Sequence, residues 1–351
     1  MKTVTVHASK NYDVLIGSGL LPLCGKYISN VLKGRSAILV SDDNVFPIYG
    51  QTVLNSLSEA GINAAVYIFP HGEQSKNLSV YGEILNAMCK AHLSRKDTVI
   101  ALGGGVTGDL AGFAAATYQR GIGFVQIPTS LLAAVDSSVG GKTGIDLPEG
   151  KNQVGAFYQP SLVLCDTDTL NTLPEEEYKN GCAEIIKYAM IGYSELLKEI
   201  SETPIKERYE TVIERCVSMK RDYVEQDEHD LGVRMMLNFG HTVGHAVEAL
   251  SNYTVAHGKA VAIGMAVISA AACKHNICND DVFTTLSKLL DQYGLPSKAP
   301  YSTDELAKAA LSDKKRQGSA LTLVVPKNIG TCELTNIESE SLADWLSGGS
   351  I

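Results

Sequence analysis

Five short apolar runs, separated by stretches with helical spacing, place the strongest constraint on how this chain can fold. The runs cover residues 37–40, 64–69, 98–102, 124–127 and 162–165. Continuous apolar strands, as opposed to alternating ones, are typical of a parallel sheet that helices cover on both faces. We therefore predict an α/β fold for the first half of the chain, with ligands bound beyond the carboxyl ends of the strands.

The pattern of apolar residues changes near residue 172, after which they recur mainly at helical spacing. The predicted helices cover residues 175–198, 205–224, 233–250, 258–275, 280–293 and 303–311, and 320–326 is a strand candidate. A chain of 351 residues exceeds the size at which one core usually stops growing. We predict two domains: residues 1–172 as a Rossmann-like parallel-sheet domain, and residues 173–351 as an all-α, or at least mainly helical, domain.

Charge and composition exclude several classes of partner. A net charge of −9 argues against nucleic acid or an anionic membrane as the main partner. No apolar run reaches the roughly 20 residues that a membrane span needs, and residues 1–7 alternate like a strand and lack a signal-peptide core. The eight cysteines form no Cys-x-x-Cys pair, which is typical of free buried thiols in a cytoplasmic protein.

Two strand ends carry residues suited to a nucleotide. Residues 103–109, with glycine at 103, 104, 105 and 108, follow a predicted strand and open a predicted helix. Glycines there let backbone N–H groups approach a pyrophosphate at the helix N-terminus. Because the dinucleotide fingerprint Gly-x-Gly-x-x-Gly is absent, a tight strand-to-helix turn remains the alternative. Asp42 and Asn44 could likewise bind an adenosine ribose or cap a helix.

Cations gather on this acidic chain near glycines and in the helical half. Lys142 and Lys151 lie beside glycines, which favours phosphate or carboxylate binding, although a single lysine is more often a solvated charge. Lys220, Arg221, Arg234 and the run 313–316 add further cations. Such grouping predicts an anionic small substrate.

Histidines cluster between residues 238 and 257. His241 and His245 are four residues apart, so a helix places both rings on one face, and His257 follows. Three histidines in so short a stretch predict a divalent metal site of the zinc kind, the alternative being core or capping histidines. Glu184 could add an oxygen ligand or simply form a surface ion pair with Lys187. On the residues alone, His245 is as good a candidate ligand as its neighbours.

Together these segments resemble the 3-dehydroquinate synthase family over nearly the whole chain. The matching segments are residues 72–76, 103–109, 118–121, 128–142, 151–152, 172–174, 184–187, 238–248, 257–258 and 313–315. The order and number of these motifs make the resemblance specific. Two departures from the family pattern are His71, where an acid is expected, and Asp230, where many relatives have Glu.

The resemblance implies a bound NAD and one divalent metal, zinc or cobalt. It implies Glu184, His241 and His257 as metal ligands and turns His245 toward the substrate. The implied NAD contacts are Asp42, Asn44, Glu73, Lys76, Gly104, Gly105, Val106, Asp109, Thr129, Ser130, Asp136, Lys142, Lys151 and Thr172. The implied catalytic and substrate contacts are Lys142, Asn152, Lys187, Lys220, Arg234, Asn238, His245 and Lys314. Arg120 would reach a neighbouring subunit's phosphate site, which implies a homodimer.

The reaction implied is that of a phosphate-eliminating carbon–oxygen lyase of the shikimate route to aromatic amino acids. It converts a phosphorylated seven-carbon keto-sugar acid, 3-deoxy-D-arabino-heptulosonate 7-phosphate, to 3-dehydroquinate and phosphate. Transient oxidation by NAD is followed by phosphate elimination, re-reduction, ring opening and intramolecular aldol closure. The competing interpretations are a cyclase acting on glucose 6-phosphate or sedoheptulose 7-phosphate, a metal-dependent polyol dehydrogenase, and a non-enzymatic nucleotide-sensing or metal-storage module.

Overall fold

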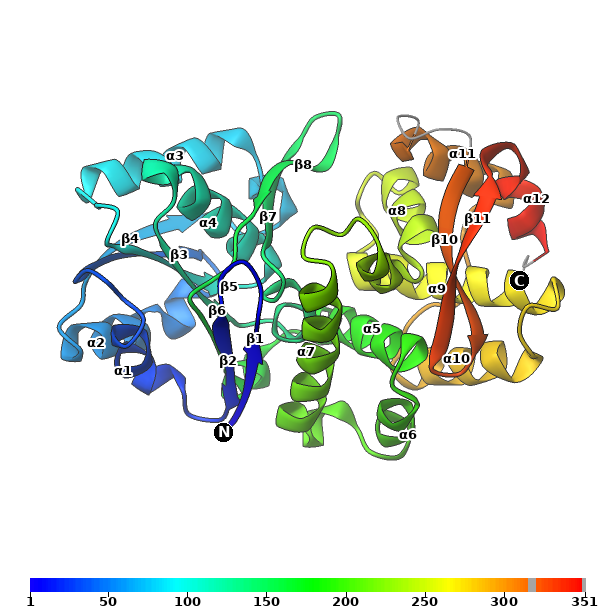
Figure 1. The fold of residues 1–351 in the computed structure, drawn as a ribbon, viewed down its shortest axis with the longest axis horizontal. Helices are drawn as coiled ribbons and strands as arrows, with labels where there is room; N and C mark the ends of the chain where they lie inside the picture. The colour runs from blue at the N-terminus through cyan, green and yellow to red at the C-terminus, as the bar shows by residue number, and fades with distance from the viewer. Residues whose placement is uncertain (315–319, 349–351) are drawn as a thin grey trace. The chain divides into compact units, whose positions relative to one another are not determined.

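The computed structural model describes residues 1–314 and 320–348, with side chains given for all of these except 312–314. Two compact units make up the chain (Figure 1). The first unit comprises Met1–Pro174 and Ile213–His229, and the second comprises Glu175–Val212 and Asp230–Ile351. The expected domain boundary at residue 172 remains a prediction. A single boundary cannot describe the return of residues 213–229 to the first unit.

The first unit is built on a seven-stranded sheet with the order β1-β2-β9-β6-β5-β3-β4. Neighbouring strands run parallel except for β1, which pairs antiparallel with β2. The strands are β1 (Lys2–Val6), β2 (Tyr12–Gly17), β3 (Ser36–Asp42), β4 (Asn63–Phe69), β5 (Thr98–Gly103), β6 (Gly123–Pro128) and β9 (Leu162–Asp166). All five apolar runs are strands, which confirms the predicted α/β class and parallel sheet.

Both faces of the sheet are buried at its central strands, which explains why β3 and β5 are apolar along most of their length. In β3, Ile38 and Val40 pack in one core with α3 (Leu78–Lys90) and α4 (Gly105–Thr117). The alternate residue Leu39 packs in the opposite core with α1 (Cys24–Ser29) and α2 (Gln51–Glu59). Successive side chains of a strand point to opposite faces, so each must be apolar when helices cover both sides.

A separate two-stranded antiparallel sheet in the first unit was not predicted. It consists of β7 (Lys142–Leu147) and β8 (Gly150–Phe157), with a register irregularity between Ile145 and Leu147. Its strands are rich in glycine and polar residues, so they lack the apolar signal of the main sheet. This hairpin carries Lys142, Lys151 and Asn152, and its conformation therefore determines how three of the predicted site residues are presented.

The second unit is mainly helical. Its helices are α5 (Glu175–Ile191), α6 (Ser194–Glu202), the start of α7 (Tyr209–Gln226), α8 (His241–Leu250), α9 (His257–Lys274), α10 (Asp280–Gln292), α11 (Thr303–Lys314) and α12 (Leu342–Ser347). The expectation of an all-α domain needs correction, because β10 (Ala320–Asn328) pairs antiparallel with β11 (Thr331–Glu338). The candidate strand 320–326 was therefore right, and its partner β11 was missed because most of its side chains are polar.

Three predicted helices are interrupted, and in the segment 205–224 a 3₁₀ turn, Ile205–Glu207, precedes α7. The segment 175–198 breaks between α5 and α6 at Gly192 and Tyr193. The segment 233–250 divides into a 3₁₀ turn, Val233–Asn238, and α8, with Gly240 between them at φ 78°. Glycine adopts this left-handed conformation without a steric penalty. The break allows α8 to begin at His241. Among the described residues, none of the helices combines the length and apolar character of a membrane span.

Helices α5, α8 and α9 approach one another closely through glycines. A Cβ at Gly264 of α9 would lie 1.9 Å from the carbonyl oxygen of Gly240, and one at Gly258 would lie 2.5 Å from the backbone of Asn180 in α5. A Cβ at Gly244 of α8 would lie 3.1 Å from the carbonyl oxygen of Ala260. Backbone therefore packs against backbone at these points, and no side chain can be inserted without moving a helix.

The glycine contact between α9 and the start of α8 leads to a stability prediction. We expect Gly264→Ala to lower the free energy of unfolding by about 1–3 kcal/mol, because its Cβ would force the two segments apart. The matched control is Gly82→Ala in α3, where a Cβ meets nothing within 4 Å. That control should be neutral or stabilising by about 0.4–1 kcal/mol. Thermal unfolding followed by circular dichroism measures both, and equal effects would contradict the packing argument.

Candidate functional sites

Three side chains from α5, α8 and α9 converge in the second unit. The ligand atoms of Glu184, His241 and His257 all lie within 4.8 Å of one another. Glu184 Oε1 is 3.4 Å from His257 Nε2 and 3.7 Å from His241 Nε2. Two imidazole nitrogens and one carboxylate are a donor set that catalytic zinc uses. The group thus has the chemistry and spacing to hold one divalent cation.

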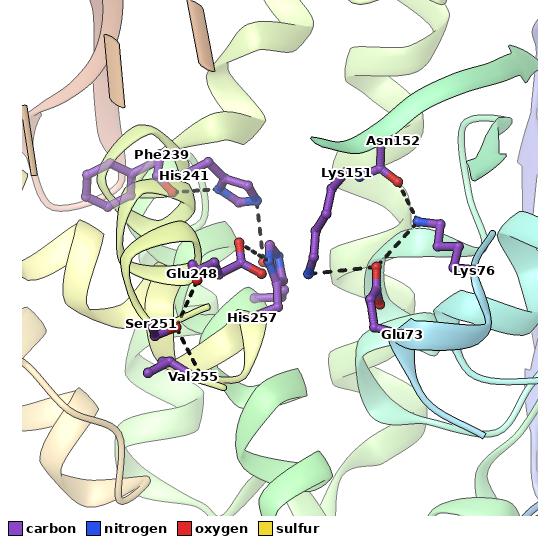
Figure 2. A network of polar contacts seen from close by, with 11 residues as sticks. Glu73, Lys76, Lys151, Asn152, Phe239, His241, Glu248, Ser251, Val255 and His257 are labelled. Carbon is purple, nitrogen blue, oxygen red and sulfur yellow. Dashed lines mark hydrogen bonds and ion pairs between the residues drawn. The ribbon is translucent and has the colours of Figure 1, made fainter. Parts of the chain in front are cut away.

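The ring of His241 is oriented by the backbone just before its helix. Its Nδ1 lies 3.1 Å from the carbonyl oxygen of Phe239 (Figure 2), so Nδ1 carries the donated proton. Nε2 therefore presents its lone pair toward Glu184. Burial lowers the pKa of His241 to about 3, against the opposing charge of Glu184. The imidazole is therefore neutral near pH 7, which is the form that ligates a metal.

His257 lies between two carboxylates. Its Nε2 faces Glu184, and its Nδ1 lies 3.4 Å from Glu248 Oε2 (Figure 2). Burial alone would lower the pKa of His257, but hydrogen bonds to Glu184 and Glu248 raise it to about 10. The surroundings of this ring therefore favour positive charge. A cation on the Nε2 side would meet Glu184, while Glu248 lies behind the ring at Nδ1.

Glu184 and Lys187 form a buried ion pair. Glu184 Oε2 lies 2.5 Å from Lys187 Nζ, and each side chain is only 1% exposed. The alternative of a solvated surface pair therefore does not apply. Because a buried carboxylate needs a compensating charge, Lys187 stabilises the ionised form of Glu184. Glu184 Oε1, on the other side of the carboxylate, faces the two histidines.

His245 lies one turn after His241 on α8 and is exposed. Its ring centroid is 5.6 Å from that of His241 and 6.2 Å from that of His257. His245, Glu248 and His257 also form a group whose ligand atoms lie within 4.8 Å. His257 is common to both groups, so they are alternative positions for a cation that share one ligand.

A buried lysine joins several predicted NAD contacts in the first unit. Lys76 Nζ lies 2.6 Å from Asp109 Oδ2 and 3.9 Å from Glu73 Oε1, and it donates to Asn152 Oδ1 (Figure 2). Lys151 Nζ lies 3.7 Å from the same Glu73 oxygen. The residues come from the segment after β4, from α4 and from β8. Their convergence shows that the scattered motifs of the sequence form one polar cluster.

Asp146 controls the shape of the hairpin next to this cluster. Its Oδ1 accepts the N–H of Asn152 at 2.7 Å, and its own N–H donates to the carbonyl oxygen of Lys76 at 2.8 Å. Asn152 adopts φ 56°, a left-handed conformation that asparagine tolerates better than most residues. Asp146 was not among the predicted site residues, because an acid in a short polar strand carries no distinctive signal.

The glycine-rich turn after β5 opens α4 with Gly104 as its N-cap and Gly105 as its first residue. A Cβ at Gly103 would lie 2.3 Å from Thr107 Oγ1. Cβ atoms at Gly104 and Gly105 would lie 3.3 Å and 3.2 Å from serine hydroxyls. The turn thus needs glycine for its own packing. Because Gly104 and Gly105 have no side chains, the backbone N–H groups at the start of α4, up to Val106, are not covered by side chains of the turn itself.

Asp42 holds the turn that follows β3. Its Oδ1 accepts the N–H groups of Asn44 at 3.0 Å and Val45 at 2.9 Å, and Oδ2 accepts from Thr107 Oγ1 at 3.3 Å. These bonds close a turn, whereas the helical segment Phe46–Gly50 has Val45 as its N-cap without a side-chain cap bond, so Asp42 is not a helix cap. A ribose contact by Asp42 or by the exposed Asn44 remains a prediction.

The other predicted residues of the first unit are distributed over several elements. Lys220 of α7 pairs with Asp136 and donates to its carbonyl oxygen at 2.8 Å. Thr172 Oγ1 lies 2.6 Å from Tyr49 OH, and the Ser130 hydroxyl accepts the N–H of Ala133. The remaining members are Thr129, which is buried, Lys142, which is exposed, and Arg120, which is exposed at φ 64° after α4.

In the second unit, Arg234 and Asn238 lie in the 3₁₀ turn before α8. Arg234 is among the largest fully buried side chains, at 1% exposed, and Asn238 is partly buried. The predicted Lys314 ends α11, and its side chain lies outside the described residues.

Glu248 is a contributor that the residue-by-residue reasoning missed. It lies seven residues after His241, which is two helical turns along the same face of α8. That spacing was available in the sequence, but a glutamate on a helix is usually solvated. Only the structure reveals that its carboxylate is buried against His257.

Comparison with known proteins identifies the family. Models described as 3-dehydroquinate synthase N-terminal and C-terminal match residues 66–180 and 181–316. Proteins named 3-dehydroquinate synthase are 43% identical in Pelobacter propionicus, covering 97% of this chain and 98% of that protein, and 43% identical in Lactococcus lactis, covering 95% and 96%.

Solved structures agree with these sequence matches. A 2-epi-5-epi-valiolone synthase from Streptomyces hygroscopicus, with NAD⁺ and Zn²⁺ bound, has a TM-score of 0.87, 27% identity and 98% coverage of each chain. A 2-deoxy-scyllo-inosose synthase complexed with carbaglucose-6-phosphate, NAD⁺ and Co²⁺ shares the fold, with a TM-score of 0.87, 24% identity and coverage of 99% of this chain and 100% of that chain. The chain belongs to the 3-dehydroquinate synthase family.

Proposed function

We propose that this chain converts 3-deoxy-D-arabino-heptulosonate 7-phosphate to 3-dehydroquinate and phosphate, as a phosphate-eliminating lyase of the shikimate route. Family membership over nearly the full length supports this assignment. The observation that carries the chemistry is the convergence of Glu184, His241 and His257. Such a set suits activation of a substrate hydroxyl, which an oxidation at carbon requires.

NAD and one divalent metal, zinc or cobalt, are the proposed cofactors. Related structures contain NAD⁺ with Zn²⁺ and NAD⁺ with Co²⁺. The chemistry that these groups supply when bound is polarisation of a substrate hydroxyl by the metal and reversible uptake of a hydride by NAD. Glu184, His241 and His257 would hold the metal, and the neutral His241 ring needs no deprotonation before it binds.

The proposed NAD contacts belong to the first unit. Backbone N–H groups of Gly104, Gly105 and Val106 at the start of α4 suit a pyrophosphate. Lys76 and Lys151 place cations beside Glu73 in the same unit. The other proposed NAD contacts, which follow the family resemblance, are Asp42, Asn44, Asp109, Thr129, Ser130, Asp136, Lys142 and Thr172.

The proposed substrate contacts are assigned unit by unit. In the first unit they are Lys142, Asn152 and Lys220, and in the second they are Lys187, Arg234, Asn238, His245 and Lys314. Lysine, arginine and histidine side chains suit the phosphate and carboxylate of this substrate. Fixed charges on buried residues such as Arg234 and Lys187 would position the substrate with little reorganisation. His245 would add modest acid–base catalysis.

A homodimer in the cytoplasm is the proposed working form. The exposed guanidinium of Arg120, after α4, is the group that would reach a partner's phosphate site. All eight cysteines are free thiols, a state that reducing compartments maintain.

The metal assignment predicts different outcomes for two histidines on the same face of the site. We expect His257→Ala to lose zinc, because one of three ligands is removed. His245→Ala should keep its zinc and lose turnover by roughly 100-fold or more, because a substrate-side acid–base group is removed. Zinc per chain after dialysis, measured beside turnover, tests both variants. Retained zinc in His257→Ala would contradict the proposed ligand set. Lost zinc in His245→Ala would indicate that His245 is a ligand.

The activity is tested by substrate choice and by chelation. We expect phosphate release from 3-deoxy-D-arabino-heptulosonate 7-phosphate to stop with a chelator and to return with zinc, without accumulation of NADH. Glucose 6-phosphate and sedoheptulose 7-phosphate should release much less. Preferential release from either of those would favour another cyclase, and steady NADH production from a polyol would favour a dehydrogenase.

A further inference from the structure

Glu248 is a buried acid placed behind a proposed metal ligand. Its side chain is 3% exposed, and its Oε2 lies 3.4 Å from Nδ1 of His257 (Figure 2). The opposite nitrogen of the same ring, Nε2, faces Glu184 at 3.4 Å. The imidazole of His257 is thus held between an inner and an outer carboxylate.

We propose that Glu248 is a positioning residue that fixes the ring orientation and the tautomer of His257 for metal binding. The proposal rests on the metal site proposed above, of which Glu184, His241 and His257 are the ligands. Glu248 itself would not touch the metal in this arrangement.

A histidine that binds a metal must be in its neutral form, in which only one of the two ring nitrogens carries a proton. A carboxylate at Nδ1 accepts that proton in a charge-assisted hydrogen bond, which leaves the lone pair on Nε2. Without an acceptor at Nδ1, the proton could move to Nε2 and face Glu184, which blocks the position of the metal. A carboxylate behind the ring also makes the ligating nitrogen more basic.

Hydrogen bonds around Glu248 connect the helix that carries it to the segment that carries His257. The carbonyl oxygen of Glu248 accepts from Tyr253 N at 2.7 Å and from Ser251 Oγ at 2.8 Å. The same hydroxyl of Ser251 accepts from Val255 N at 3.2 Å. These bonds tie the end of α8 to the segment that opens α9 at His257 (Figure 2).

The two histidines of the site are therefore supported differently. Nδ1 of His241 faces a neutral backbone carbonyl, that of Phe239. Nδ1 of His257 faces a charged carboxylate. His257 is the more exposed ring, at 34% compared with 13% for His241, so packing restrains it less. The less enclosed ring of His257 thus has the stronger acceptor, the carboxylate of Glu248, as expected if this carboxylate fixes the orientation of the ring.

The alternative is that Glu248 binds the metal directly, in the group formed with His245 and His257. The two roles differ in which other carboxylate matters. A positioning role makes Glu184 indispensable to zinc binding, whereas a direct role makes Glu248 the indispensable carboxylate.

The test is the zinc dissociation constant of metal-free variants, measured by competition with a chromophoric chelator. We expect Glu248→Gln to bind zinc about 10–100-fold more weakly than the unsubstituted protein. Glu184→Gln should lose zinc binding altogether. The matched control is Asp166→Asn, which removes another buried carboxylate, one that accepts backbone N–H groups in the first unit, and should leave zinc affinity unchanged.

Unchanged zinc affinity in Glu248→Gln, with zinc lost in Glu184→Gln, would overturn the proposal and leave the metal site standing. Zinc lost in Glu248→Gln but kept in Glu184→Gln would make Glu248 a ligand and overturn both. Nitrogen-15 NMR of the zinc-loaded, unsubstituted protein needs no variant to fold. It should find the proton of His257 on Nδ1, and coordination through Nδ1 would contradict the proposal.

Discussion

The close approach of α9 to α5 and α8 is the constraint on which the second unit depends. Gly258 and Gly264 let α9 meet the backbones of Asn180 and Gly240 with no side chain between them. Because the three helices are this close, one side chain from each can reach a common point. His241 and His257 begin their helices, and Glu184 lies within α5, so the same contacts that pack the helices bring the three donors together.

Buried charge is the second physical theme, and it is balanced locally in each unit. Glu184 is offset by Lys187 in the second unit, and Lys76 is offset by Asp109 in the first. Removing one partner of such a pair leaves an uncompensated charge, which is strongly destabilising. Buried ion pairs stabilise a fold less than apolar side chains of similar volume do. Their presence at the two clusters therefore indicates that the charges serve binding and chemistry more than stability.

Sequence reasoning predicted the elements whose signal is local. The apolar strands of the main sheet, the helical texture after residue 173 and the strand 320–326 all follow from spacing that one element contains. The hairpin of β7 and β8 and the strand β11 were missed, since polar strands depend on partners that spacing does not reveal. The break at Gly240 was also missed, and only the structure shows how closely this residue approaches Gly264.

The candidate sites divide in the same way. The histidine spacing identified His241, His245 and His257 as a group, and the structure brings all three rings together in two possible metal groups. Glu248 and Asp146 act through groups that lie next to them only after folding. Asp42 holds a turn after its strand, a role that the sequence alone could not separate from helix capping or ribose binding.

The most direct test of the account is X-ray absorption at the zinc edge of the loaded protein. The account predicts two imidazole nitrogens and one carboxylate oxygen at about 2.0–2.2 Å, with the remaining position open to solvent or substrate. A sulfur scatterer at about 2.3 Å, or a third imidazole in place of the carboxylate, would contradict the ligand set of Glu184, His241 and His257.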